Sequence, residues 1–202
     1  MARGCRLLPF LLALILAAGC REEGGVKVSS FTFRGNEAVA TGQLRQVLAT
    51  QPSSKLPWGV KRYFSREQFE ADLKRIVAFY TDRGYPNARV TGFDVQLSDD
   101  QSSVEIAVNI DEGEPLRVER IALEGFEPLP EEQRATLAAR LPQKEGQPLD
   151  RALMQASREV ALDQLRDHGH PYASVRVAEL PGSAESLRVL ELRADAGPVA
   201  VV

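Results

Sequence analysis

Two closely spaced histidines are the side chains in this sequence with the clearest potential for chemistry. His168 and His170 flank Gly169, and Asp163 and Asp167 lie just before them; these residue types can bind a metal ion. No zinc-helix, phosphate-loop or nucleophile-elbow motif accompanies them, and no two residues are placed as a general acid and base pair. The sequence therefore favours a protein that is not an enzyme and that has no metal site and no cofactor.

Both cysteines of the chain lie in an amino-terminal export signal. Two arginines occur in residues 1–6, residues 7–16 form an apolar run, and the small residues 17–19 precede Cys20. The run is too short to cross a membrane, which requires roughly 20 apolar residues. We therefore predict a signal peptide over residues 1–19. The small residues would suit ordinary signal peptidase, but next to a cysteine they resemble a bacterial lipobox. We favour lipid attachment at Cys20, with residues 20–25 as a tether.

The composition is that of a folded protein without a nucleic-acid-binding surface. The chain has 202 residues, of which 44% are hydrophobic, and its 25 Lys and Arg are outnumbered by 28 Asp and Glu. The basic residues are interspersed with acidic ones, which disfavours binding to a phosphate backbone. Because no cysteine follows Cys20, we expect the mature chain to be held together by its apolar cores, without disulfides.

An internal repeat organises the mature chain. Residues 80–90 and 165–175 share Asp, Gly, Pro, Ala and Val at corresponding positions. The same alignment, after a small change in loop length, pairs the segment around Asp111 with the segment around Asp195. We interpret the mature chain as two copies of one module, over residues 26–113 and 114–202.

Each copy is expected to contain a short helix followed by a long one. In the first copy, apolar residues recur at helical spacing between Ser65, the expected N-cap, and Gly84, the expected stop: Phe69, Leu73, Ile76, Val77 and Tyr80. The second copy repeats this pattern between Asp150 and Gly169, with Arg158 in the place of Leu73. Shorter helices are expected over residues 41–49 and 131–141.

The remaining segments alternate with period two, which predicts strands. A hairpin is expected on either side of the turn 98–102 in the first copy and of the turn 181–183 in the second. In the first strand of each copy, Val28 and Val118 are out of phase with the apolar residues that follow, which indicates a bulge or a late start of the strand.

Three prominent side chains are interpreted as structural. The repeat aligns His168 and His170 with Arg83 and Tyr85, which bind no metal, so we expect a helix end and a packed ring rather than ligands. Trp58 lies in the longer loop between the two helices of the first copy. It could anchor a binding partner, but we expect it to pack over the helices.

The element order and four motifs resemble those of a known family. The motifs are Phe-Arg-Gly-Asn at 33–36, the segments 63–73 and 79–88, and Asp-Glu-Gly at 111–113. Together they are similar to tandem POTRA domains of outer-membrane assembly proteins of the BamA and TamA type. The resemblance implies an α+β fold of two tandem β-α-α-β-β modules, each a three-stranded mixed sheet covered on one face by two helices. Residues 197–202 match the opening of the second copy, which leaves two interpretations: a further module begins there in a longer protein, or the chain is a freestanding periplasmic lipoprotein made of POTRA modules.

The resemblance also implies a function. It indicates a non-enzymatic scaffold on the periplasmic side of the outer membrane of a Gram-negative-type bacterium, which binds unfolded outer-membrane proteins or assembly-complex proteins. In POTRA domains the second strand is a sheet edge that can pair with an extended peptide. The candidate edge residues are therefore Arg89, Val90, Thr91, Phe93 and Val95 in the first copy, and Ser174, Val175 and Val177 in the second. The alternative is a POTRA scaffold of a secretion or cell-division complex.

Overall fold

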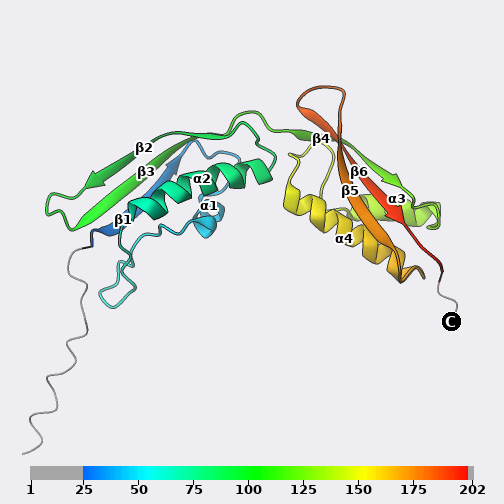
Figure 1. Cartoon of the computed structure of the whole chain (residues 1–202), viewed down its shortest axis with the longest axis horizontal. Coiled ribbons are helices and arrows are strands. Elements are labelled where there is room, and N and C mark those ends of the chain that lie inside the picture. The colour runs from blue at the N-terminus through cyan, green and yellow to red at the C-terminus, as the bar shows by residue number, and fades with distance from the viewer. Residues whose placement is uncertain (1–24, 200–202) are drawn as a thin grey trace, which may run out of the picture.

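The computed structural model describes residues 25–199, which form two modules with the same order of elements (Figure 1). The first module comprises β1 (Lys27–Arg34), α1 (Thr41–Val47), α2 (Arg66–Asp82), β2 (Arg89–Leu97) and β3 (Ser103–Asp111). The second comprises β4 (Arg117–Glu124), α3 (Glu131–Arg140), α4 (Arg151–Asp167), β5 (Ser174–Pro181) and β6 (Leu187–Asp195). The predicted signal peptide, Cys20 and the tether up to residue 24 lie outside the described residues.

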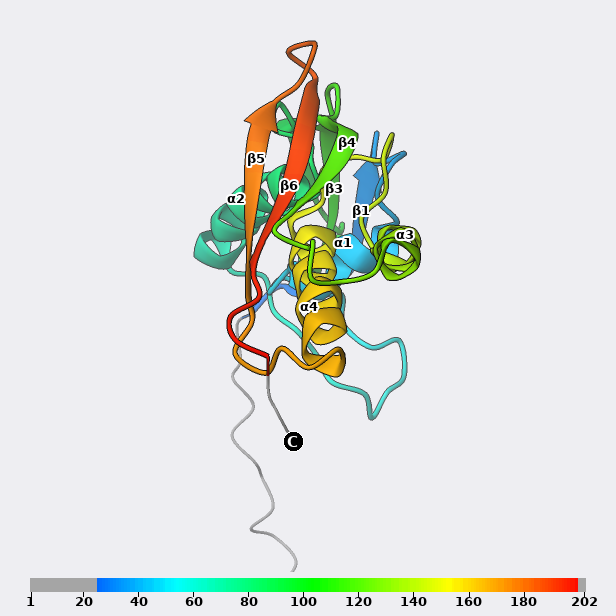
Figure 2. The same cartoon turned by 90° about the vertical axis from the view of Figure 1, so that its right-hand side faces the viewer.

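Each module is built around one three-stranded mixed sheet. The strand order is β1-β3-β2 in the first module and β4-β6-β5 in the second. The first strand of each module runs parallel to the central strand, and the hairpin partner runs antiparallel to it. Both helices of a module lie on the same face of its sheet, and the other face is left open (Figures 1 and 2). This arrangement confirms the predicted α+β fold.

Local signals in the sequence place the two long helices. The Ser65 hydroxyl accepts a hydrogen bond from the Gln68 N–H at 3.3 Å, so Ser65 is the N-cap of α2 as predicted. The Asp150 carboxylate accepts bonds from the N–H groups of Ala152 and Leu153 at the start of α4. Gly84 follows α2 with a φ of +88°, the left-handed conformation that ends a helix and that glycine adopts most readily.

The irregular phase of the first strands has the predicted cause. The register of β1 against β3 shifts between Val28 and Ser30, and that of β4 against β6 shifts between Val118 and Arg120. One extra residue in each strand therefore turns Val28 and Val118 into the core, where both are buried.

Each module has its own apolar core between sheet and helices. The first core is formed by buried residues of β1, α1, α2 and β3, including Phe31, Leu44, Ile76, Tyr80 and Ile106, and Val90 of β2 packs against it while partly buried. The second contains Leu137, Leu141, Leu165, Val175 and Leu192. Phe69 and Ile76, which we predicted as core residues, are buried.

A buried carboxylate ties the end of α1 to α2. Asp72 is fully buried, and its oxygens accept hydrogen bonds from the N–H groups of Ala49 at 3.0 Å and Thr50 at 2.7 Å and pair with Arg75. Burial alone would raise the pKa of Asp72, but the hydrogen bonds from Thr50, Ala49 and Arg75 outweigh it and hold the pKa below its ordinary value. The carboxylate is therefore ionised at neutral pH and satisfies backbone groups that would otherwise be buried without a partner.

The modules meet where α2 ends and the second module begins. Arg83 pairs with Asp150 at 3.0 Å, and Asp82 pairs with Arg151 at 2.9 Å. The carbonyl of Gly84 accepts a hydrogen bond from the Leu116 N–H at 2.8 Å. A Cβ atom at Gly84 would lie only 2.7 Å from the backbone nitrogen of Leu149, so the close approach requires glycine. The two modules are thus joined by backbone and charged contacts rather than by a shared core.

Candidate binding edges of the two sheets

The candidate edge residues lie on β2 and β5, the outer strands of the two sheets. Each of these strands pairs only with the central strand of its own sheet. The structure therefore places the first group of predicted residues, Arg89 to Val95, along one open edge, and the second group, Ser174 to Val177, along another. It does not bring the two groups together into one site, because they belong to separate sheets.

The hairpin turn fixes which backbone groups of β2 face outward. The Ser98 N–H donates to the carbonyl of Ser103 at 2.9 Å, so these opposed residues form a hydrogen-bonded pair. Such pairs alternate with pairs whose N–H and C=O groups point away from each other. With the register that pairs Leu97 with Val104, the outward groups of β2 are those of Phe93, Val95 and Leu97.

The same reasoning sets the phase of β5. The Gly182 N–H donates to the carbonyl of Leu187 at 3.1 Å, and the register continues without a bulge. The outward backbone groups are therefore those of Val175, Val177, Glu179 and Pro181. Proline has no N–H, and on an edge strand it is tolerated where that group would face outward, so the position of Pro181 agrees with this phase.

An apolar groove runs beside the open edge of β2. It has a volume of about 640 Å³ and lies between α2 and β2, lined by Leu73, Lys74 and Val77 from the helix and by residues 89–93 from the strand. The Phe93 ring, which is 52% exposed, packs edge-on against Phe69 with the ring centroids 5.1 Å apart. Outward backbone groups and apolar surface thus lie side by side.

A bulge interrupts β2 at the end nearest this groove. The register against β3 shifts between Val90 and Gly92, so Thr91 is the extra residue, and its hydroxyl donates to the Asn109 carbonyl at 3.3 Å. Regular pairing for an incoming strand is therefore available from Phe93 onward. Arg89, Val90 and Thr91, which we predicted as edge residues, lie before this point and line the groove instead.

The second module presents a more polar surface beside its edge. In the repeat, Arg158 of α4 stands where α2 has Leu73, and it forms an ion pair with the neighbouring Glu159. Val177 takes the place of Phe93 on the strand. The two edges are alike in backbone but differ in the side chains that flank them.

The sequence pattern did not assign Leu73 and Val77 to a binding surface. Both belong to the apolar stripe of α2, which we assigned to the core, and both are only partly buried. The sequence signal for this surface was the width of the apolar stripe. Leu73 and Val77 lie along one side of the stripe and stay partly exposed, whereas Phe69, Ile76 and Tyr80 are buried.

The histidines occupy the structural positions predicted for them. His168 ends α4, with its Nδ1 2.7 Å from the carbonyl of Gln164, and the ring of His170 is buried in the following loop. Across residues 25–199, no group of three His, Cys, Asp or Glu side chains is arranged to hold a metal ion. Within the same range, no helix is both long and apolar enough to cross a membrane.

The expectation for Trp58 was wrong. We expected it to pack over the helices, but its side chain is 83% exposed at the tip of the loop between α1 and α2. The cause is a loop held by its own hydrogen bonds, in which Ser54 N–H donates to the Val60 carbonyl at 2.9 Å and Gly59 N–H to the Leu56 carbonyl at 3.0 Å.

Comparison with protein families finds a match over the first module. Residues 26–113 match the POTRA family, described as surface antigen variable number repeat. The match covers β1 through β3 and therefore the whole first module.

Comparison with individual proteins finds relatives of the same kind. Over 164 residues, 80% of this chain, the sequence is 24% identical to the outer membrane protein assembly factor BamA of Neisseria meningitidis serogroup B. Over 102 residues it is 32% identical to a putative outer membrane protein assembly factor of Treponema pallidum. The chain spans only 20% and 12% of the lengths of these two proteins. Among solved structures, the Haemophilus influenzae BamA POTRA3-5 crystal structure covers 87% of this chain, and 68% of its own chain is covered, at 27% identity and a TM-score of 0.44.

Proposed function

Since residues 26–113 form a POTRA domain and the second module repeats its topology, we propose that this chain is a non-enzymatic periplasmic scaffold in outer-membrane protein assembly or translocation. Its partners are unfolded outer-membrane proteins or proteins of the assembly complex. It binds extended polypeptide by strand-edge pairing, chiefly at β2. The observation that carries this proposal is the row of outward N–H and C=O groups on β2 beside the apolar groove of α2.

The groove suggests which extended segments bind best. A strand added beside Phe93, Val95 and Leu97 takes backbone hydrogen bonds from β2 and places every second side chain on the helix side of the sheet. At its Phe93 end it reaches the groove that Leu73 and Val77 line. Strands of outer-membrane barrels alternate between apolar and polar residues, so they offer an apolar row for the groove and a polar row for the open face.

The second edge is the weaker site in this proposal. Its backbone groups at Val175, Val177 and Glu179 also point away from the central strand, but Val175 is buried and Arg158 replaces the apolar side chain of Leu73. Backbone pairing alone gives modest affinity, because each exposed hydrogen bond contributes only about 1 kcal/mol. The first module is therefore expected to take up peptide first, and the second to add to binding when one segment spans both modules.

Proline at Val95 is expected to weaken the binding of an alternating apolar and polar peptide about tenfold or more. Proline removes an outward N–H and blocks the approach of a strand, while the β2–β3 ladder does not use that group. Pro181 occupies an outward position of β5, so the fold accepts proline at such a place. Peptide affinity, expected in the millimolar to micromolar range, is measured by NMR titration, which also reports the amides that shift.

Matched variants isolate the edge mechanism. Val95→Ala keeps the N–H and should bind almost as the natural chain does. Gln96→Pro is not a usable probe, because the N–H of Gln96 points toward β3 and its loss would disrupt the sheet. Val177→Pro should reduce binding less than Val95→Pro. Peptide-induced shifts confined to the neighbourhoods of His168 and Trp58 would refute edge pairing.

We also propose that Cys20 carries a lipid that holds the scaffold at the periplasmic face of the outer membrane. The support is the apolar run and the small residues before Cys20. Intact-mass measurement of the natural chain should show the added acyl chains. Cys20→Ser, processed by ordinary signal peptidase at Ala17 to Gly19, should release the protein into the soluble periplasm. A natural chain with no added mass would overturn this proposal.

A further inference from the structure

The loop between α1 and α2 carries the most exposed large apolar side chains of the first module. Trp58 is 83%, Val60 69% and Leu56 53% exposed. The loop extends away from both the sheet and the helices, at the end of the module where β1 begins (Figure 1). We name residues 55–62 the tryptophan loop.

Internal contacts hold the tryptophan loop in shape. The Lys61 ammonium donates to the carbonyls of Ser54 and Leu56, both at 2.9 Å. A Cβ atom at Gly59 would lie 2.0 Å from the Ser54 hydroxyl, so the turn closes only around glycine. The loop therefore holds Trp58 in an exposed position. Because the loop is already ordered, binding does not require a further loss of its conformational entropy.

The charged residues of the tryptophan loop itself are all positive. Lys55, Lys61 and Arg62 flank its apolar tip, and no acidic residue occurs between Glu37 and Glu67. The whole chain, in contrast, has a formal net charge of −3. An exposed Trp with aliphatic neighbours and a cationic rim is the combination that inserts into the headgroup region of a bilayer containing anionic lipids.

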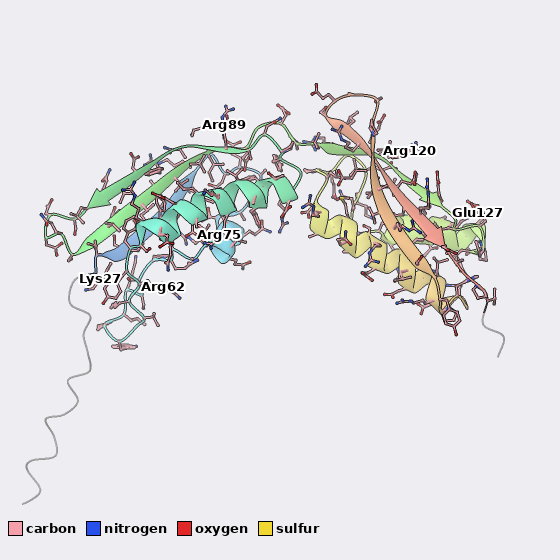
Figure 3. The ribbon with its side chains drawn as sticks, viewed as in Figure 1. Lys27, Arg62, Arg75, Arg89, Arg120 and Glu127 are labelled. Atoms are coloured by element: carbon pink, nitrogen blue, oxygen red, sulfur yellow. The ribbon has the colours of Figure 1, made fainter. Side chains whose placement is uncertain are left out.

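The start of the folded chain lies at the base of the same loop. Gly25 lies against the Tyr63 ring, and the Val28 N–H donates to the Arg62 carbonyl at 2.9 Å. Lys27 and Arg62 accordingly lie at the same end of the first module (Figure 3). Four residues lie between Cys20 and Gly25, so the two are at most about 17 Å apart along the chain. A lipid on Cys20 would therefore hold the tryptophan loop within reach of the membrane surface.

We propose that the tryptophan loop is a second membrane contact, which inserts Trp58 into the interface of a bilayer containing anionic phospholipid. The choice of a membrane over a protein partner rests in part on the lipid attachment proposed above, while the charge and exposure of the loop stand without it. Two contacts at one end of the module would fix the orientation of the first sheet relative to the membrane. A single acyl anchor would leave that orientation free.

Trp58 provides its own probe, because it is the only tryptophan in the chain. The test uses the chain from residue 20 onward with Cys20→Ser, which has no lipid and keeps every residue that the structure describes. Adding phosphatidylglycerol-containing vesicles should shift the tryptophan emission to shorter wavelength, and brominated acyl chains should quench it. Pure phosphatidylcholine vesicles should have little effect, and salt should weaken the binding.

Variants distinguish the proposed contact from general attraction. Lys55→Gln and Arg62→Gln should each weaken binding to the anionic vesicles about fivefold. Arg120→Gln, an exposed cation of the second module, should leave it unchanged. Trp58→Ser, followed by co-sedimentation with vesicles, should nearly abolish binding. All four variants should keep the peptide affinity of the β2 edge, which separates this proposal from the proposed function.

Two results would overturn the proposal. One is an emission that stays the same with anionic vesicles. The other is an emission that shifts only when purified outer-membrane protein in detergent is added, which would assign the loop to a protein partner. The mass of the natural chain tests the lipid on Cys20 separately.

Discussion

Replacing Ile76 by alanine is expected to lower the free energy of unfolding of the first module by about 2 to 5 kcal/mol. The side chain is 1% exposed and lies in the core that includes Phe31, Tyr80 and Ile106. Neighbours drawn from both the sheet and α2 cannot all move into the space, so a cavity adds to the lost burial. Urea denaturation followed by circular dichroism measures the loss.

Two comparisons make this result specific. Leu165→Ala removes a buried residue of the second core and should destabilise mainly the second module, which hydrogen exchange of individual amides resolves. Val60→Ala, at an exposed site, should change stability by less than about 0.5 kcal/mol. A similarly small effect of Ile76→Ala would contradict its place in the core. A loss of protection in both modules would contradict two separately folding cores.

Disruption of a polar network at the end of the first sheet is the second change that we expect to lower stability strongly. The Tyr80 hydroxyl donates to Glu112 at 2.8 Å, and both Glu112 oxygens accept from the Ala38 N–H at 3.0 Å. Tyr80→Leu should lower the free energy of unfolding by about 2 to 4 kcal/mol, since it removes buried ring atoms and leaves the half-buried Glu112 without its phenol partner. Thermal unfolding monitored by circular dichroism measures the effect.

The second module replaces the members of this network together. The repeat places Leu165 at the position of Tyr80, Ala196 at that of Glu112, and Pro128, which has no N–H, at that of Ala38. Tyr80→Leu combined with Glu112→Ala should therefore cost less than the sum of the two single changes, by about 1 kcal/mol. Additive losses would show that the phenol and the carboxylate contribute independently.

The same network predicts a loss of stability in alkali. Burial, and then the hydrogen bond to Glu112 and its charge, raise the pKa of Tyr80 above its ordinary value of 10.0. Below pH 10 both the folded and the unfolded state keep the phenol proton, so stability does not change. Above it, the unfolded state releases the proton first and is favoured, so stability falls as pH rises. Tyr80→Phe, which cannot ionise, should reduce this slope, and the remainder belongs partly to Tyr85, whose pKa is also raised by burial.

Local signals in the sequence specify the elements and their order. Ser65 and Gly84 delimit α2 through a cap and a left-handed residue, and these act on neighbouring backbone groups alone. The bulges near Val28 and Val118 were readable because an extra residue shifts the alternation that follows. The repeat then extended each assignment to the second module. All of these signals are local, so a short window of sequence contains them.

The surfaces available for binding depend on how the elements pack together. The outward direction of the Phe93, Val95 and Leu97 backbone groups depends on the register with β3, and the groove forms only where α2 crosses beside β2. The exposure of Trp58 depends on hydrogen bonds that close its loop away from the helices. The register and the groove join residues from different elements, whereas the hydrogen bonds of the Trp58 loop are local to residues 54–60. The register and the groove depend on how separate elements are positioned relative to one another. Composition and periodicity within one element do not specify that position.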